Sequence, residues 1–306
     1  MNFKKITLIA IRILIGIVFV LSAVTKYISI EAFDMFVFEH ELFSWNLTNF
    51  ITRILIASEA CLGLMLLFGI FTKLSRWLTI GSLVVFTIYI LIKPFFFEVN
   101  SDNCHCFGEV MILSDNQTLI KNVVLLLFST ALFFDKGWKL KYAKYILIAS
   151  FILPLATTFI VRPPDVIAHA IYGKQIELNM DSFEKLLNMD KVQDMKVSEG
   201  KKVLCLYSTA CKHCKRTAIK IDVIIKRHKL NKQDFVVLFW GKENSIDVFY
   251  KETAAELLPT NQVPPLLFLS ATKGRQPIIV LLDNGRIVDL YKSTNINEQK
   301  IVEFLN

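Results

Sequence analysis

The N-terminal half of this 306-residue chain contains five apolar runs, each long enough to cross the hydrocarbon core of a lipid bilayer. The expected spans are residues 6–28, 51–71, 76–96, 118–134 and 144–161, of which the fourth is the shortest. The first run is longer than the apolar core of a signal peptide, so we expect a retained helix. A chain that crosses lipid must satisfy its backbone hydrogen bonds within each span, which predicts an α-helical membrane bundle.

Lysine and arginine gather in alternate loops between these spans. They precede the first span and follow the second and fourth: Lys4, Lys5, Lys73, Arg76, Lys136, Lys139, Lys141 and Lys144. The other loops carry acidic residues: Glu31, Asp34, Glu39, Glu41, Glu98, Asp102, Glu109 and Asp115. Because basic loops stay in the cytoplasm, we expect a cytoplasmic N-terminus and an extracytoplasmic chain after Arg162. The expected location is the inner membrane of a bacterium, with the C-terminal domain in the periplasm or at the cell exterior.

Composition separates the chain into two kinds of sequence. Hydrophobic residues make up 54% of the whole, but the excess lies before about residue 162, and the remainder has the balance of an ordinary globular domain. The net charge of +8 comes from lysines that are scattered or flank apolar runs, with no basic stripe among aromatic residues, which argues against nucleic-acid binding. The expected domains are 1–135 (membrane core), 136–162 (fifth span), 163–196 (linker with short helices) and 197–306 (globular domain).

A cysteine pair marks the start of a helix in the globular domain. Residues 202–207 have strand character, residues 212–229 have a helical pattern, and Cys211-Lys212-His213-Cys214 lies where one gives way to the other. A thiol at a helix N-terminus faces unpaired N–H groups and the positive end of the helix dipole, which lower its pKa. Two cysteines at this spacing after a strand are typical of a redox centre.

The position of each thiol predicts its role. Cys211 is nearer the helix N-terminus and is the expected nucleophile, and Cys214 is the expected resolving thiol. Lys212, His213 and Lys215 add positive charge that favours the thiolate, and the charge of His213 changes near neutral pH. The alternatives are half a zinc site, which needs a second close pair of ligands, or two unreactive thiols.

A second pair, Cys104 and Cys106, flanks His105 in the loop after the third span. Span counting places this loop on the same outer side as Cys211 and Cys214. Two pairs in one compartment can pass electrons by thiol–disulfide exchange. A Cys-x-Cys bridge closes a very small ring, which favours a labile disulfide. The alternative is a metal site with Cys104, His105 and Cys106 as ligands, although three adjacent ligands rarely suit one ion.

The rest of the globular domain contains a second apolar strand at 234–240, a helix at about 245–258 and a hairpin turn at Asp283-Asn284-Gly285. Residues 165–180 are a candidate juxtamembrane helix, and Asp181 is a candidate N-cap for the next one. Two prolines, Pro264 and Pro277, compete for a position facing the cysteines. Pro277 is preferred because strand, hairpin, strand and final helix follow it. The alternative is an ordinary proline at a strand edge.

These C-terminal residues resemble the thioredoxin family. The strand, the turn with Cys211-Lys212-His213-Cys214 and the following helix are similar to its active-site turn, and the -Cys-x-His-Cys- form is similar to its disulfide-handling members. The resemblance implies a thioredoxin-like α/β domain in which Pro277 is a cis-proline. Its expected work is to hold extended backbone beside the disulfide for a substrate strand to pair with.

The membrane half resembles a second family over about residues 5–135. Residues 11–26 and 59–69 are similar to the first two helices of the DoxX superfamily, and Cys104-His105-Cys106-Phe107-Gly108-Glu109, with residues 121–126, is similar to its MauE branch. The resemblance implies a four-helix membrane core linked with redox maturation of exported proteins. MauE proteins are associated with methylamine dehydrogenase, a disulfide-rich enzyme, but nothing in this sequence names that client.

Several ionisable residues lie within the spans, where a charge is costly and is usually functional or paired. Glu59 lies about 12 Å inside the second span at the helical rise per residue, at a depth that suits pairing with Lys26. The pair is either structural or part of a polar pocket that admits a quinone or relays protons. Arg12 lies nearer the cytoplasm and is expected to reach the interface. Cys61 is expected to be a packing residue.

Together these patterns predict a membrane-anchored thiol–disulfide oxidoreductase. Its catalytic residues are Cys211, Cys214, Cys104 and Cys106, supported by Pro277, His213, Lys212, Glu59 and Lys26, with no covalently bound cofactor. The expected partners are the lipid bilayer, exported thiol or disulfide proteins and quinone. Two directions of electron flow stay open: an oxidising relay would deliver electrons to quinone, and a reducing relay would draw them from the cytoplasm. The presence of only Cys61 within a span favours the oxidising relay. The alternatives are quinone-linked oxidation of small sulfur compounds and a non-catalytic, metal-binding assembly protein.

Overall fold

The computed structural model describes residues 3–96, 106–108, 110–111, 113–138, 140–172, 177–242 and 245–306. The chain forms two compact units, Met1–Pro164 and Asp165–Asn306. Each unit has its own core and is described by itself.

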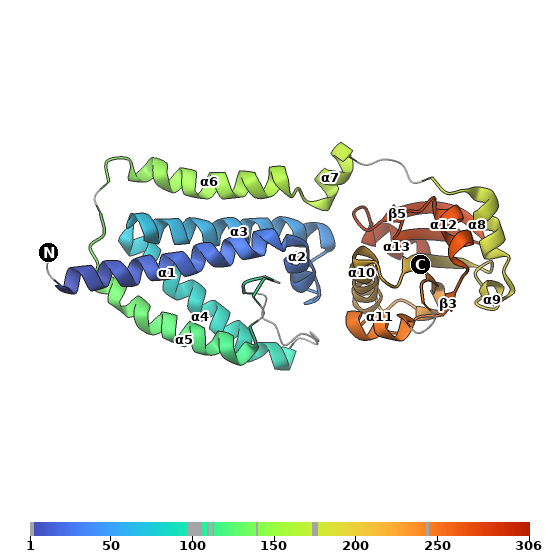
Figure 1. Ribbon diagram of the computed structural model, residues 1–306, viewed down its shortest axis with the longest axis horizontal. Helices are drawn as coiled ribbons and strands as arrows, with labels where there is room; N and C mark the ends of the chain where they lie inside the picture. Colours follow the sequence, from blue (N-terminus) through green and yellow to red (C-terminus); the bar gives the residue numbers. More distant parts are fainter. Residues whose placement is uncertain are drawn as a thin grey trace. The chain divides into compact units, whose positions relative to one another are not determined.

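The N-terminal unit is built on five long apolar helices, as predicted (Figure 1). They are α1 (Phe3–Ile28), α3 (Trp45–Phe68), α4 (Thr72–Phe96), α5 (Asp115–Ala131) and α6 (Ala143–Val161). The short helix η1 (Leu132–Phe134) extends α5, so the fifth span is the shortest and the prediction for the fourth was wrong. Helix α3 begins at Trp45 and not at residue 51, because its polar first turns are covered by neighbouring protein.

Helix α2 (Ile30–Phe38) lies in the loop between the first two spans and was not predicted. Phe33 and Phe36 pack with Ile56 of α3 in a small apolar cluster. This helix is shorter than any span, and its apolar residues merge with the end of the first run in the sequence. It covers one end of the bundle with packed side chains.

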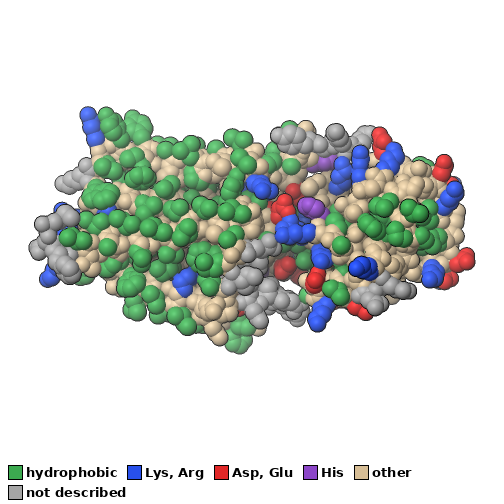
Figure 2. Space-filling view, viewed as in Figure 1, with side chains coloured by type: hydrophobic (Ala, Val, Ile, Leu, Met, Phe, Trp, Pro, Cys, Tyr) green, Lys and Arg blue, Asp and Glu red, His purple; other side chains and the backbone are tan. Residues whose placement is uncertain are grey.

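Helices α1 and α3 make the closest helix contact of the described bundle. A Cβ on Gly63 would lie 2.9 Å from the carbonyl oxygen of Gly16, so the absence of side chains here allows the two backbones to approach. Helices α4 and α5 pack together on one flank of α1, and α6 packs against α3 on the other (Figure 1). Hydrophobic side chains cover the visible face of this unit, as expected of a surface in contact with lipid (Figure 2).

Four buried cations of the described bundle each contact a carboxylate. The pairs are Arg12–Asp135 (2.8 Å), Lys26–Glu59 (2.5 Å), Arg53–Asp34 (2.8 Å) and Lys93–Asp115 (3.0 Å). The expectation that Arg12 reaches the interface was wrong. Its side chain is 1% exposed and its guanidinium lies over the ring of Trp138, because the loop after α5 brings Asp135 back to it. A buried charge is retained only with such compensation.

The C-terminal unit is an α/β domain around one mixed sheet of five strands in the order β3-β2-β1-β4-β5. The strands are β1 (Lys201–Ser208), β2 (Phe235–Trp240), β3 (Thr260–Gln262), β4 (Ile278–Asp283) and β5 (Arg286–Lys292). Strands β1, β2 and β3 are parallel, whereas β4 is antiparallel to β1 and to β5. The predicted hairpin turn joins β4 to β5, with Asn284 and Gly285 both at positive φ.

Helices cover both faces of this sheet (Figure 1). The helices of this unit are α7 (Asp165–Tyr172), α8 (Met180–Leu187), α9 (Asp190–Gln193), α10 (Lys212–His228), α11 (Ser245–Thr253), α12 (Pro265–Thr272) and α13 (Glu298–Leu305), with the short turn η2 (Lys232–Asp234). Residues 163–196, expected as a linker, supply Phe183, Leu186 and Leu187 to the core under Leu204 and Leu206. The N-cap of α8 is Asn179, whose side chain accepts from Ser182, and not Asp181.

Candidate functional site

The two cysteines of the C-terminal unit lie at the junction of β1 and α10, as the sequence predicts. Cys211 is the N-cap of α10, and its Sγ accepts a hydrogen bond from the backbone N–H of Cys214 at 3.3 Å. Cys214 lies in the first helical turn and is fully buried, and its Sγ accepts from the N–H of Ser208 at 3.4 Å. Both sulfurs are free thiols, and Cys211 is the partly exposed one.

The electrostatic environments of the two thiols differ. The pKa of Cys211 is lowered to about 6, chiefly by the hydrogen bond from the Cys214 thiol, against an opposing effect of burial. The backbone N–H groups of Cys214 and His213, and the charge of His213, add to the lowering. Burial and the hydrogen bond to Cys211 raise the pKa of Cys214 well above its ordinary value. The pair is therefore suited to nucleophilic attack by Cys211 and later attack by Cys214.

The three basic residues around the pair have different surroundings. His213 is exposed, and its charge favours the Cys211 thiolate. Lys215 forms an ion pair with Glu252 of α11, which offsets its charge. Lys212 is exposed at the first position of α10. The sequence therefore identified the cations, but it did not show that Glu252 lies beside one of them.

Pro277 follows a cis peptide bond with Gln276, as predicted, whereas Pro264 caps α12. Strand register pairs Ile278 of β4 with Leu206 of β1. Pro277 therefore lies at the end of the sheet where β1 runs toward Cys211.

The lowered pKa of Cys211 predicts how its reactivity depends on pH. The thiolate forms as pH rises through about 6, so the rate of alkylation by iodoacetamide should be half-maximal near pH 6 and level above pH 7. Burial raises the pKa of Cys205 to about 12, so this thiol of β1 should stay unmodified. Peptide mass spectrometry of the reduced full-length protein measures each rate. A half-maximum at pH 8 or higher would contradict the proposed environment.

The other cysteine pair lies partly outside the described residues, since Cys104 and His105 are not among them. Cys106 is disulfide-bonded, so in this state its sulfur is not available to a metal. Its carbonyl oxygen accepts from Ser22 Oγ of α1 at 2.7 Å. Gly108 has φ +59°, and a Cβ there would lie 2.0 Å from Ser29 Oγ and 2.9 Å from the carbonyl of Thr25. Only glycine allows the chain after Cys106 to lie this close to α1.

A small cavity of about 30 Å³ with a mixed polar and apolar lining lies beside Cys106, and we call it the polar cavity after its five polar residues. Its polar lining comes from α1, α3 and α5 and consists of Ser22, Lys26, Glu59, Lys121 and Asn122. Lys26 donates to Glu59 Oε1 at 2.5 Å, and Ser22 Oγ lies 3.0 Å from Glu59 Oε2. The expected Lys26–Glu59 contact is therefore present, and it lies next to Cys106. The cavity is too small for a quinone ring.

Sequence reasoning assigned no role to Lys121, Asn122 or Ser22. Lys121 lies inside the fourth predicted span, and the rule that an ionisable residue in a span is functional or paired would have singled it out. Ser22 and Asn122 carried no comparable signal, because uncharged polar residues are common in membrane helices. Their grouping depends on how α1 and α5 pack.

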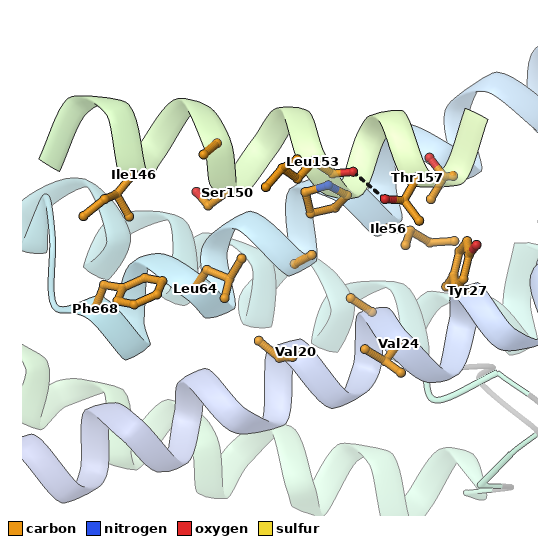
Figure 3. Close-up of a pocket in the computed structure, with 15 residues that line it drawn as sticks. Val20, Val24, Tyr27, Ile56, Leu64, Phe68, Ile146, Ser150, Leu153 and Thr157 are labelled. Atoms are coloured by element: carbon orange, nitrogen blue, oxygen red, sulfur yellow. Dashed lines mark hydrogen bonds between the residues drawn. The ribbon is translucent and has the colours of Figure 1, made fainter. Parts of the chain in front are cut away.

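A larger groove, of about 600 Å³, lies between α1, α3 and α6 (Figure 3). Its lining is almost entirely apolar, with Val20, Val24, Leu64 and Leu153 among the side chains that face it. The residues of α1 that line this groove alternate with those that line the polar cavity. The groove therefore lies on the opposite face of α1 from Cys106. Nearby, Cys61 lies 3.4 Å from Ser150 Oγ in a packed cluster, as expected of a packing residue.

Residues 4–135 match the model of the family described as methylamine utilisation protein MauE. Within the N-terminal unit, these residues are a MauE-like membrane domain. The resemblance to MauE predicted over residues 5–135 is therefore confirmed, whereas the resemblance to the wider DoxX superfamily stays a prediction. Protein TlpB of Flavobacterium psychrophilum is 25% identical over 350 aligned positions, which cover 96% of this chain and 93% of that protein. No solved structure matches the chain significantly. The chain is a multi-pass membrane protein that joins a MauE-like domain to an α/β domain.

Proposed function

We propose that this protein is a membrane-anchored thiol–disulfide oxidoreductase in which Cys211 and Cys214 exchange electrons with the disulfide of the MauE-like domain. The observation that carries the proposal is the asymmetric thiol pair at the N-terminus of α10. Cys211 is partly exposed with a lowered pKa, and Cys214 is buried with a raised one. This combination suits an attacking and a resolving thiol.

The exchange balances without any further reagent. The Cys211 thiolate attacks one sulfur of the loop disulfide, a new S–S bond forms, and the other loop sulfur leaves as a thiolate with the electron pair. Cys214 then loses its proton and attacks Cys211 Sγ, which releases the second loop sulfur. The C-terminal pair is now a disulfide and the loop pair a dithiol, so two electrons have moved to the membrane domain. The same steps in reverse move the two electrons from the membrane domain to the C-terminal pair.

Both pairs must share a compartment for this exchange. Five spans with basic residues in alternate loops support a cytoplasmic N-terminus, with the Cys106 loop and the C-terminal domain on the outer side. We propose that the protein lies in a bacterial inner membrane and that its clients are exported proteins, since disulfides form and persist mainly outside the cytoplasm. Protein TlpB aligns over both units, so the similarity is not limited to the membrane domain.

We propose quinone as the final electron acceptor. Within the described spans only Cys61 offers a thiol, and one thiol does not supply a disulfide route across the bilayer. Oxidation of the loop dithiol by quinone would transfer two electrons and two protons and yield quinol and the disulfide. A quinone ring in the large groove would lie across α1 from Cys106, so contact with the disulfide requires a different approach.

The test is dithiol oxidation by the purified full-length protein. The disulfide form, given a reduced model peptide, should oxidise it, and Cys211→Ser should lower the rate by at least about 10²-fold, because the attacking thiolate is lost. Cys205→Ala is the matched control, since Cys205 is fully buried within β1. A Cys211→Ser variant as fast as the wild type would overturn the proposal. The midpoint potential of the Cys211–Cys214 pair then gives direction, since reductants lie near −270 mV and strong oxidants near about −120 mV.

A further inference from the structure

The polar cavity beside Cys106 contains one more positive charge than negative charge. Lys26 and Glu59 form an ion pair and neutralise each other. Lys121, from α5, lines the same cavity, and its ammonium lies 4.8 Å from the centre of the Phe107 ring. Among the described residues, Lys121 has no carboxylate at ion-pair distance. This sets it apart from Arg12, Lys26, Arg53 and Lys93, each of which has one.

The side-chain amide nitrogen of Asn122 lines the same cavity and has no hydrogen-bond partner among the described residues. Asn122 is 2% exposed, and its Nδ2 donates no hydrogen bond among the described residues. An unsatisfied buried donor lowers stability, so such groups usually have a partner in a working state. The cavity volume of about 30 Å³ accommodates only a very small occupant, such as one or two waters or a sulfur atom.

Burial of Cys106 bears on which sulfur of the disulfide is attacked. Cys106 is 6% exposed and packs with Phe107 against Val18 and Leu113. An incoming thiolate needs to approach along the S–S axis, and burial disfavours such an approach to the Cys106 sulfur. When attack falls on the other sulfur of the bridge, Cys106 is the leaving group.

We propose that this cavity is a thiolate site: Lys121 and Asn122 receive the sulfur of Cys106 as the disulfide opens. The proposal rests on the proposed function for its reductant, the Cys211–Cys214 dithiol. The attacking thiolate bonds to the partner sulfur, the S–S bond to Cys106 breaks, and Cys106 keeps the electron pair. Its negative charge then balances Lys121, and Asn122 Nδ2 gains an acceptor. A better-stabilised leaving thiolate departs faster.

The experiment measures reduction of the Cys106 disulfide by dithiothreitol in full-length protein carrying Cys211→Ser and Cys214→Ser. In this background Lys121→Met should slow reduction by about 10-fold, because the leaving thiolate loses its counter-charge. Lys121→Arg, which keeps the charge, should restore a rate close to that of Lys121. Lys141→Met is the matched control at an exposed lysine, and its rate should not change.

If Lys121 has a purely structural role, its substitution should change the melting temperature. The rate of disulfide reduction should then not depend on whether the new side chain is charged. Lys121→Gln is a second neutral variant in case Lys121→Met does not fold. A wild-type rate in either folded neutral variant would overturn the inference. Because dithiothreitol replaces the C-terminal pair, a slow Lys121→Met variant supports the thiolate site even if the exchange between the two pairs fails. A Lys121→Met variant that is reduced as fast as the wild type would rule out the thiolate site but not the exchange between the two pairs.

Discussion

Replacing both Cys104 and Cys106 with alanine is expected to leave the Cys211–Cys214 pair almost entirely reduced in cells, if electrons leave through the membrane domain. The physical reason is that exchange through a mixed disulfide is the only proposed outlet for these electrons. Acid quenching of cells, alkylation with a maleimide polymer and gel electrophoresis separate the dithiol from the disulfide. We expect this double variant to change the ratio of dithiol to disulfide more than any other variant described for this protein.

Cys61→Ala is the control for this experiment. Cys61 belongs to the same membrane domain, but it packs beside α6 and contacts Ser150, away from the lining of the polar cavity. Its loss should leave the C-terminal pair in the wild-type redox state. If the double variant also showed the wild-type ratio of dithiol to disulfide, the two pairs would not be connected. A pair locked as the disulfide would instead show that electrons flow outward.

The sequence predicts features that depend on local patterns. The spans follow from length and hydropathy, the redox turn from the spacing of Cys211 and Cys214, and the β4–β5 hairpin from Asn284-Gly285. Each signal lies within one continuous stretch of sequence, and the structure confirms the five long apolar helices, the position of the two cysteines at the start of α10 and the hairpin. Redox activity of the turn stays a prediction.

The sequence could not predict contacts between residues that lie far apart in the chain. Arg12 was expected at the interface, but its partner Asp135 is 123 positions away. Glu252 offsets Lys215 from another helix. Lys121 and Asn122 line the cavity only because α5 packs against α1 beside Cys106. The short strand β3 was missed because its three residues carry no strand pattern.

Replacing Cys214 with serine is expected to trap Cys211 in a mixed disulfide with the loop of the MauE-like domain. Cys211 remains able to attack, since the serine hydroxyl can still donate to its sulfur and the N–H groups of α10 are unchanged. No resolving thiol remains to release the product, so the intermediate should accumulate from a trace to a major species. Cys211→Ser, which removes the attacking sulfur, should give none.

The most direct test of the proposed exchange is therefore to detect the disulfide between Cys211 and the loop of the MauE-like domain. Membranes containing the Cys214→Ser variant, with Cys205→Ala to leave one cysteine in the peptide, are blocked with N-ethylmaleimide and digested with trypsin without reduction. The account predicts that peptide 203–212 is joined by a disulfide to the peptide containing Cys104 and Cys106, with Cys106 carrying the maleimide. If Cys211 is found only as a free thiol or joined to other proteins, the proposed exchange between the two cysteine pairs is contradicted.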